Sequence, residues 1–319
     1  KYLEVDPDLA ETSVETGKRA NQVVGIRTSP GAAGTVVNNL AALGAGTLHA
    51  VGATGDDGEA FDLRKGLEAQ RCSTDGLLRF DFVNTPTYLK PRDVNDPSLA
   101  GEHERYDTKN RRPTPREACD KILARLDALL PAVDAVIIAD QVTEADCGVV
   151  TAAVRDALAE RTRKHPQVIF WADSRAHIRK FRQVIIKANQ FEAVGHDNPL
   201  PDEVIEIDRL REAVPQLRKQ IGAPVCVTRG AAGMIVSDPE VTLIPGVKLT
   251  GPTDPTGAGD SATAGSVLAL SSGASWPEAA LLGCLVASIT VQQLATTGTA
   301  TPQQVIERLD LWRLQNSGK

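Results

Sequence analysis

Apolar residues along the second half of the chain recur in a pattern that predicts strands alternating with helices. Short apolar runs, which are typical of buried strands, lie at residues 135–139, 168–172, 184–187 and 224–228. Helical spacing of apolar residues occurs at residues 116–130, 145–164 and 202–221. This alternation predicts an α/β fold with a mostly parallel central sheet covered on both faces. Ligands of such sheets bind at the carboxyl ends of the strands.

The two ends of the chain carry weaker patterns. The first 115 residues are more polar, and their strand-like patches lie at residues 2–5, 22–26, 47–53, 77–83 and 87–91. Helices are predicted at residues 31–45 and 61–69, and the polar segment 91–115 is expected to be a loop or part of a lid. The remaining elements are a hairpin and three helices, at residues 234–237 and 241–244, then 261–270, 277–295 and 302–314.

Composition and charge narrow the classes of function. Of the 319 residues, 42% are hydrophobic and 24% charged, so we expect one globular domain over residues 1–319. The net charge of −6 argues against a general nucleic-acid surface, and an anionic substrate would need a local basic pocket. Five scattered cysteines without a C-x-x-C pair are typical of a reduced cytoplasmic protein. No apolar run is long enough to span a membrane, and no signal peptide is visible.

The stretch 254–265 carries the strongest chemical signal, and it reads Asp-Pro-Thr-Gly-Ala-Gly-Asp-Ser-Ala-Thr-Ala-Gly. Gly257, Ala258 and Gly259 let the backbone turn tightly and approach a ligand, and N–H groups at a helix N-terminus bind anions. Asp260 follows in the first helical turn. A carboxylate there repels phosphate unless it accepts the proton of an attacking hydroxyl. The alternative is that Asp260 only caps its helix.

Two other phosphate motifs were compared with this stretch. Gly257, Gly259 and Ala262 also satisfy G-x-G-x-x-A, the dinucleotide fingerprint, but that motif should follow directly on a strand early in a βαβ unit. A Walker A loop is excluded because no Lys-Ser or Lys-Thr follows the glycines.

Residues 254–260 closely resemble the D-T-x-G-A-G-D motif of the ribokinase-like (PfkB) sugar kinases. The resemblance implies that Asp260 is the catalytic base and that Gly257, Ala258 and Gly259 form the anion hole for the transferred phosphoryl group. It also implies a three-layer sandwich with a small β lid, here residues 1–29 and about 77–108, which excludes water from the site. The first strand of that fold would lie upstream of residue 1. Lids of this family often pair between subunits, so a homodimer is expected.

The same resemblance implies sites for the cofactors ATP, Mg²⁺ and K⁺. Asn189 and Glu192 match the N-x-x-E motif, and side chains at positions i and i+3 can together hold a hydrated Mg²⁺. The family seats ATP with a V-T-x-G-x-x-G stretch, which is matched here by Thr228 and Gly230. Many relatives bind a monovalent cation near the anion hole, and the oxygen donors at the matching place are Asp254 and Thr256.

Substrate contacts are expected at two places. The segment 30–44 resembles the sugar-binding P-G-G-A-x-N stretch and contributes Gly31, Thr35 and Asn39, although Ala32 replaces a glycine and Thr35 an asparagine. Basic residues that suit a sugar phosphate are Lys90, Arg92 and Arg105 in the expected lid and Arg175 after a predicted strand. Residues 85–92 and 104–107, with Asn39, look most like the D-glycero-D-manno-heptose-7-phosphate kinases.

The sequence therefore predicts an ATP-dependent kinase that phosphorylates a hydroxyl of a small sugar or sugar phosphate. A second hypothesis is a relative that binds nucleotide or sugar without efficient transfer, because Ala32, Thr35 and the missing first strand depart from the family pattern. A third hypothesis, an NAD enzyme, depends on the G-x-G-x-x-A match alone.

Overall fold

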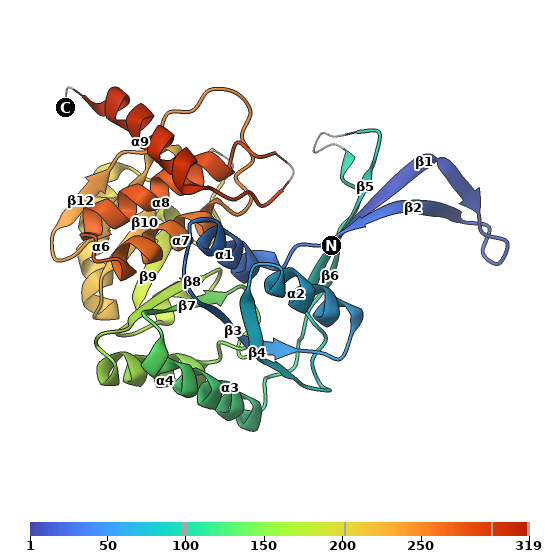
Figure 1. Cartoon of the computed structure of the whole chain (residues 1–319), viewed down its shortest axis with the longest axis horizontal. Coiled ribbons are helices and arrows are strands. Elements are labelled where there is room, and N and C mark those ends of the chain that lie inside the picture. The colour runs from blue at the N-terminus through green and yellow to red at the C-terminus, as the bar shows by residue number, and fades with distance from the viewer. Residues whose placement is uncertain (97–100, 201, 295, 318–319) are drawn as a thin grey trace.

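A computed structural model describes residues 1–96, 101–200, 202–294 and 296–317. Figure 1 shows a layered body from which a small β sheet projects to one side. Residues 97–100 of the expected lid and residue 295, the expected end of a helix, lie outside the described residues.

The body contains a six-stranded sheet with the order β12-β11-β10-β9-β8-β7. Its strands are β7 (Ala135–Asp140), β8 (Ile169–Ser174), β9 (Ile185–Asn189), β10 (Val225–Thr228), β11 (Met234–Ser237) and β12 (Val241–Ile244). β7 to β10 run parallel, and β11 and β12 are antiparallel at one edge. The four buried strands and the hairpin predicted from sequence are confirmed, and the carboxyl ends of β7 to β10 face the same way.

Helices cover both faces of this sheet, which confirms the three-layer α/β architecture (Figure 1). One face carries α3 (Arg116–Leu129), α4 (Ala152–Lys164), α5 (Gln190–Val194) and α6 (Ile207–Ile221). The other face carries α7 (Ala258–Ser271) and α8 (Trp276–Thr290), with α1 (Gly31–Ala42) packed on α7 and α9 (Pro302–Asn316) packed on α8. Successive residues of β8 point to opposite faces, so Phe170 joins the first core and Trp171 the second.

β3 (Leu48–Thr54) and β4 (Cys72–Arg79) form a separate parallel pair in the body, with α2 (Gly58–Glu68) packed on β4. The strand predicted at 77–83 instead spans Cys72–Arg79, so its predicted bounds are wrong. Backbone pairing with β3, and not the apolar content of the segment, sets where β4 begins and ends. Residues 77–79 therefore belong to the body and not to the lid. Within the described residues, no hydrogen-bonded ladder joins this pair to the six-stranded sheet.

The projecting sheet is the expected lid, with the strand order β2-β1-β5-β6. Its strands are β1 (Tyr2–Thr12), β2 (Arg19–Arg27), β5 (Thr87–Asp93) and β6 (Tyr106–Thr108). Arg27, Tyr2 and Lys90 are direct neighbours across three strands and share one face, and the adjacent row of Ile26, Leu3 and Pro91 occupies the other. The lid thus carries a charged row on one face and an apolar row on the other.

Several helices begin or end at residues that the apolar pattern did not mark. α4 begins at Ala152 and not at 145, because the Thr151 hydroxyl accepts a hydrogen bond from the Val154 N–H and caps the helix. α6 begins at Ile207 and not at 202. α7 begins at Ala258, three residues before the prediction, and so includes Asp260. Among the described helices, none combines the length and hydropathy needed to cross a bilayer.

Candidate active site

The N-terminus of α7 begins at a glycine-lined bend. Gly257 is the N-cap and has a φ of 78°, in the left-handed region that favours glycine. A β-carbon on Gly257 would lie 3.3 Å from Thr35 Cγ2 and 3.4 Å from Thr297 Cγ2, so α1 and the loop before α9 close tightly around it. The Ala258 N–H donates to the Pro255 carbonyl at 3.0 Å. By helix geometry, the N–H groups of Gly259 and Asp260 then remain to bind an anion.

Asp260 is the third residue of α7, and its carboxyl is half-buried. No side chain caps this helix, so the alternative that Asp260 is only a cap is not supported. Burial, reinforced by the negative charge of Asp173 and partly offset by Lys187, raises the pKa of Asp260 to about 7. A carboxyl with such a pKa can accept and release a proton near neutral pH, as general base catalysis requires.

Lys187 lies beneath this bend and was not predicted as a site residue. Its side chain is almost fully buried, and its Nζ lies 2.8 Å from Asp173 Oδ2 on the neighbouring strand. Burial lowers the pKa of Lys187, but attraction to Asp173, Asp260 and Glu192 outweighs this and raises the pKa overall. A β-carbon on Gly259 would lie 3.2 Å from Nζ, so the glycine lets the helix approach the ammonium group. One feature of the sequence could have pointed to Lys187. It is a single charge at the end of the apolar run 184–187, and a buried charge needs a partner.

Asn189 and Glu192 form a reciprocal cap on α5. Asn189 Oδ1 accepts hydrogen bonds from the N–H groups of Phe191 and Glu192, and Glu192 Oε2 accepts one from the Asn189 N–H at 2.7 Å. Burial raises the pKa of Glu192. Thr228 is the direct neighbour of Asn189 across the β9–β10 ladder, and its hydroxyl donates to the Ala188 carbonyl.

The described residues contain no group of three His, Cys, Asp or Glu side chains that could enclose a metal ion. Asp254 is buried and its Oδ1 accepts from the Thr256 N–H at 2.9 Å, whereas the Thr256 side chain is exposed. Gly230 has a φ of 55° and nothing within 4 Å of its β-carbon position, so it borders open space beyond β10.

Asn39 is one of the expected sugar contacts on α1, and in the structure its side chain bonds to other protein groups. Asn39 is fully buried, and its amide nitrogen donates to the Thr35 carbonyl, the Ser261 hydroxyl and the Gly298 carbonyl. Its oxygen accepts from the Ala300 N–H. Asn39 therefore ties α1 to α7 and to the loop before α9, and its contact with a sugar stays a prediction. Thr35 lies beside Gly257 but is also buried, and its hydroxyl donates to Gly31.

Asn39→Ala should lower the free energy of unfolding by about 2–4 kcal/mol, because several buried groups lose partners worth about 1–3 kcal/mol each. Urea unfolding measures the change. Asn38→Ala is the matched control on the same helix, since Asn38 Oδ1 has no hydrogen-bond partner. Equal stability of the Asn39 variant and the wild type would contradict the structural role.

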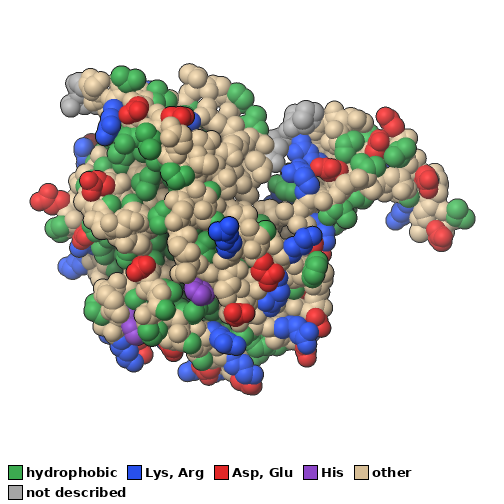
Figure 2. Space-filling model, viewed as in Figure 1, with side chains coloured by type: hydrophobic (Ala, Val, Ile, Leu, Met, Phe, Trp, Pro, Cys, Tyr) green, Lys and Arg blue, Asp and Glu red, His purple; other side chains and the backbone are tan. Residues whose placement is uncertain are grey.

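Of the four basic residues expected to bind a sugar phosphate, three lie in the lid and Arg175 lies in the body. Lys90 pairs with Glu102 at 3.1 Å, and its Nζ lies 5.8 Å from the centre of the Tyr2 ring. Arg92 Nη2 donates to the Asp96 carbonyl. Arg105 pairs with Asp107 and stacks on Tyr88, which shares one face of β5 with Lys90. Arg175 is exposed after β8. Figure 2 shows that Lys and Arg side chains on the lid are interspersed with acidic ones.

A match to a protein-family model identifies the family of this chain. Residues 3–304 match the model of the pfkB family carbohydrate kinases. The chain belongs to this family. The resemblance predicted from residues 254–260 is confirmed, and membership indicates an ATP-dependent sugar kinase.

Curated relatives of this pfkB family member include several proteins called bifunctional protein HldE. The protein from Nitratiruptor sp. is 28% identical over 279 residues, which cover 87% of this chain and 56% of the relative. The protein from Caulobacter sp. is 33% identical over 275 residues, covering 83% of this chain and 52% of the relative. The chain thus spans about half the length of these relatives.

Solved structures of the same fold include ribokinase from Thermotoga maritima, with a TM-score of 0.67 and 17% identity over 97% of this chain and 95% of that one. Phosphofructokinase-2 from Escherichia coli in complex with potassium has a TM-score of 0.69 and 17% identity at the same coverages. The ribokinase-like fold is confirmed. The NAD hypothesis is not supported. Its motif should follow directly on a strand, but β12 ends at Ile244, well before Gly257.

Proposed function

We propose that this pfkB family member uses ATP to phosphorylate a hydroxyl of a sugar or sugar phosphate, with Asp260 as the general base. The observation that carries the proposal is a half-buried carboxyl with a pKa of about 7 in the first turn of a glycine-started helix. A base near neutral pKa and anion-binding N–H groups within one helical turn suit phosphoryl transfer to an alcohol.

The roles of the chain's own groups follow from their positions. Asp260 takes the proton of the acceptor hydroxyl as that oxygen attacks the terminal phosphorus of ATP. The N–H groups of Gly259 and Asp260 donate to the transferring group, and the ammonium group of Lys187 offsets its charge from below. The Ala258 N–H, expected to contribute, is already bonded to Pro255 and supports the bend instead.

The nucleotide is proposed to lie over the carboxyl ends of β9 and β10. Thr228, Asn189 and the open space beside Gly230 border that region. Mg²⁺ would neutralise phosphate charge there, with Glu192 holding it through water. Asp254 and Thr256 remain the proposed oxygen donors for K⁺, and the potassium complex of the E. coli structure makes that ion the first to test.

The acceptor is proposed to lie between the lid and the N-terminus of α7. The resemblance to D-glycero-D-manno-heptose-7-phosphate kinases makes a heptose phosphate the first acceptor to test. The alternative is a protein that binds nucleotide or sugar without efficient transfer, which the departures at Ala32 and Thr35 from the family pattern still favour.

An ADP-release screen over sugars and sugar phosphates, with ATP and Mg²⁺, separates these two functions. Turnover of one acceptor class that is abolished in Asp260→Asn supports the kinase. ATP that raises the melting temperature without any turnover supports the binding protein.

We also propose that the lid pairs with the lid of a second copy. The apolar lid row faces away from the charged row, and Ile26 in it is 61% exposed. An exposed apolar sheet face of this kind usually marks an interface. Light scattering should find a dimer that Ile26→Lys converts to monomer, whereas Val14→Lys at the lid tip leaves it intact. A monomeric wild type would refute this interface.

A further inference from the structure

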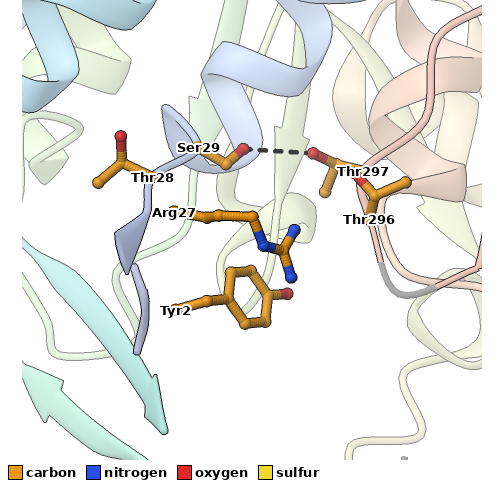
Figure 3. Close-up of a pocket in the computed structure, with 6 residues that line it drawn as sticks. All are labelled: Tyr2, Arg27, Thr28, Ser29, Thr296 and Thr297. Atoms are coloured by element: carbon orange, nitrogen blue, oxygen red, sulfur yellow. Dashed lines mark hydrogen bonds between the residues drawn. The ribbon is translucent and has the colours of Figure 1, made fainter. Parts of the chain in front are cut away.

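A pocket in the body borders the short helix that carries Glu192. It has a volume of about 250 Å³ and lies between α5 and one side of α6, and Arg179 of the 3₁₀ turn Ile178–Lys180 lines it as well. It is separate from the pocket of about 370 Å³ where the lid meets the loop before α9, in which Arg27 stacks on Tyr2 (Figure 3). From the pocket in the body, Arg179 reaches the carboxyl end of α5.

The Arg179 side chain closes that end of the helix. Its Nη1 donates to the carbonyl of Ala193 at 2.9 Å and to that of Glu192 at 3.4 Å. Gly195, the C-cap, packs on the same guanidinium group, because a β-carbon on Gly195 would lie 3.4 Å from Nη1. The last carbonyls of a helix lack partners within it, and the helix dipole favours a cation at this end. Arg179 therefore supplies donors that α5 cannot supply itself.

The guanidinium group is in turn held by α6. Its Nη2 donates to Gln220 Oε1 at 3.5 Å, and Gln220 Nε2 donates back to the Arg179 carbonyl at 3.2 Å. Ile178, the residue before Arg179, is 3% exposed and belongs to the core that α6 covers. Within the described chain, none of the hydrogen bonds of this guanidinium group goes to a carboxylate. Its charge therefore acts on the carbonyl oxygens of α5 and on the amide of Gln220.

α5 depends on contacts at its two ends. It has only five residues, Gln190–Val194, and a helix of that length is not stable without tertiary contacts. Glu192 takes part at both ends, because its Oε2 accepts from the Asn189 N–H and its own carbonyl accepts from Arg179. Glu192 Oε1 accepts no hydrogen bond from the described chain, and a carboxylate oxygen suits a hydrated Mg²⁺. The direction of this carboxylate is therefore set by how α5 is held.

We propose that Arg179 is a positioning residue for the metal-nucleotide site, which fixes the Glu192 carboxylate by holding the carboxyl end of α5. The proposal rests on the function proposed above, in which Glu192 holds Mg²⁺ through water. Arg179 acts through α5 and not by contact with the reactants. Without its guanidinium group, α5 takes several orientations, and only the fraction with the native one binds ATP and Mg²⁺ together at full strength.

The test measures nucleotide binding with and without metal, so it does not depend on turnover. Isothermal titration calorimetry gives the Kd of ATP, in Mg²⁺ and in a chelator, for wild type, Arg179→Ala and Arg182→Ala. Arg182 is the matched control, because it is exposed and donates only to the carbonyls of Arg179 and Phe181 and not to α5. Arg179→Ala should weaken the binding of ATP with Mg²⁺ by about 5–30-fold, the loss of charge-assisted hydrogen bonds, and that of ATP alone much less. Arg182→Ala should change both constants less than about 3-fold.

The pocket beside Arg179 allows chemical rescue. Removing the side chain leaves its place open to the pocket, so a free guanidinium ion can occupy it. Guanidinium chloride at about 20–50 mM, far below the molar concentrations that unfold proteins, should restore at least about 3-fold in the affinity of Arg179→Ala for ATP with Mg²⁺. Sodium chloride at the same concentration should not. Arg179→Lys keeps the charge and should lose less affinity than Arg179→Ala, and it replaces the alanine variant if that variant does not fold.

Equal weakening of ATP binding with and without Mg²⁺ would make Arg179 a general support of the fold and would overturn the proposal. Unchanged affinity in the Arg179 variants would do the same, and so would a wild type whose affinity for ATP does not respond to Mg²⁺. The kinase function is judged separately. Turnover by the wild type with normal affinity in the Arg179 variants removes only this inference, whereas a wild type without turnover removes the kinase function and leaves the binding test in force.

Discussion

Asp260→Asn should fold normally, bind ATP and lose about 10²–10⁴-fold in kcat, the usual contribution of a general base. The amide keeps the shape of the carboxyl but cannot accept the hydroxyl proton. Single-turnover measurements of ADP formation provide the test. Asp208→Asn is the matched control, since Asp208 occupies the first turn of α6 as Asp260 does in α7 but is exposed to solvent. Turnover near the wild-type rate in the Asp260 variant would rule out the assigned base.

The pH dependence of the wild type should report the same carboxyl. Because the base acts when deprotonated, kcat/KM should rise with pH and level off above about 7, the pKa of Asp260. The folded-state pKa is raised, so the folded protein binds the proton more tightly than the unfolded chain. Asp260 therefore lowers stability as pH rises from about 4 to 7. The asparagine variant should be more stable than the wild type at pH 8, by up to about 4 kcal/mol at 1.4 kcal/mol per pKa unit, and equally stable near pH 3.

Lys187→Met should lower kcat by about 10²–10³-fold, the loss typical of removing one group that stabilises transition-state charge. The substitution keeps the aliphatic stem and removes the buried ammonium group. It also removes the positive charge that lowers the pKa of Asp260, so the acid limb of the pH profile should move to higher pH. A pH titration of kcat/KM separates this electrostatic role from a general structural one.

The control for this second prediction is Lys180→Met, which removes an exposed lysine near the same strand. It should leave both kcat and the acid limb unchanged. The Lys187 variant should also unfold at lower temperature near neutral pH, because Asp173 loses its partner while largely buried. A Lys187 variant with wild-type kcat and an unmoved acid limb would show that the ammonium group only holds β8 and β9 together.

The body of the fold could be predicted because its signals are local. The runs 135–139 and 224–228 are short and apolar, as strands buried on both faces of a sheet are. The extent of β4 could not be predicted in the same way. Its polar residue Ser73 belongs to the strand because His49 of β3 is its partner, and such pairing leaves no mark on the apolar pattern.

The residues of the candidate site also differ in whether their roles could be predicted from sequence. The glycines and Asp260 were found because a tight bend and an acid at a helix start need those residue types at adjacent positions. The structural role of Asn39 could not be predicted, since a buried amide that bonds distant backbone groups looks the same in sequence as one that contacts a sugar.

The sequence by itself determined the α/β layers and the family, and it supplied the proposal of Asp260 as the base, because each depends on residues close together in the chain. Only the tertiary structure decided what surrounds that base. Strand pairing sets Lys187 beside Asp173, and helix packing sets both beneath Gly259. The pKa of Asp260 is therefore raised by burial and by Asp173 and partly lowered again by Lys187, two groups that lie more than 70 residues before it in the chain. The pocket at Arg27 has the same origin, because contact between the lid and the loop at Thr297 joins two segments from opposite ends of the chain.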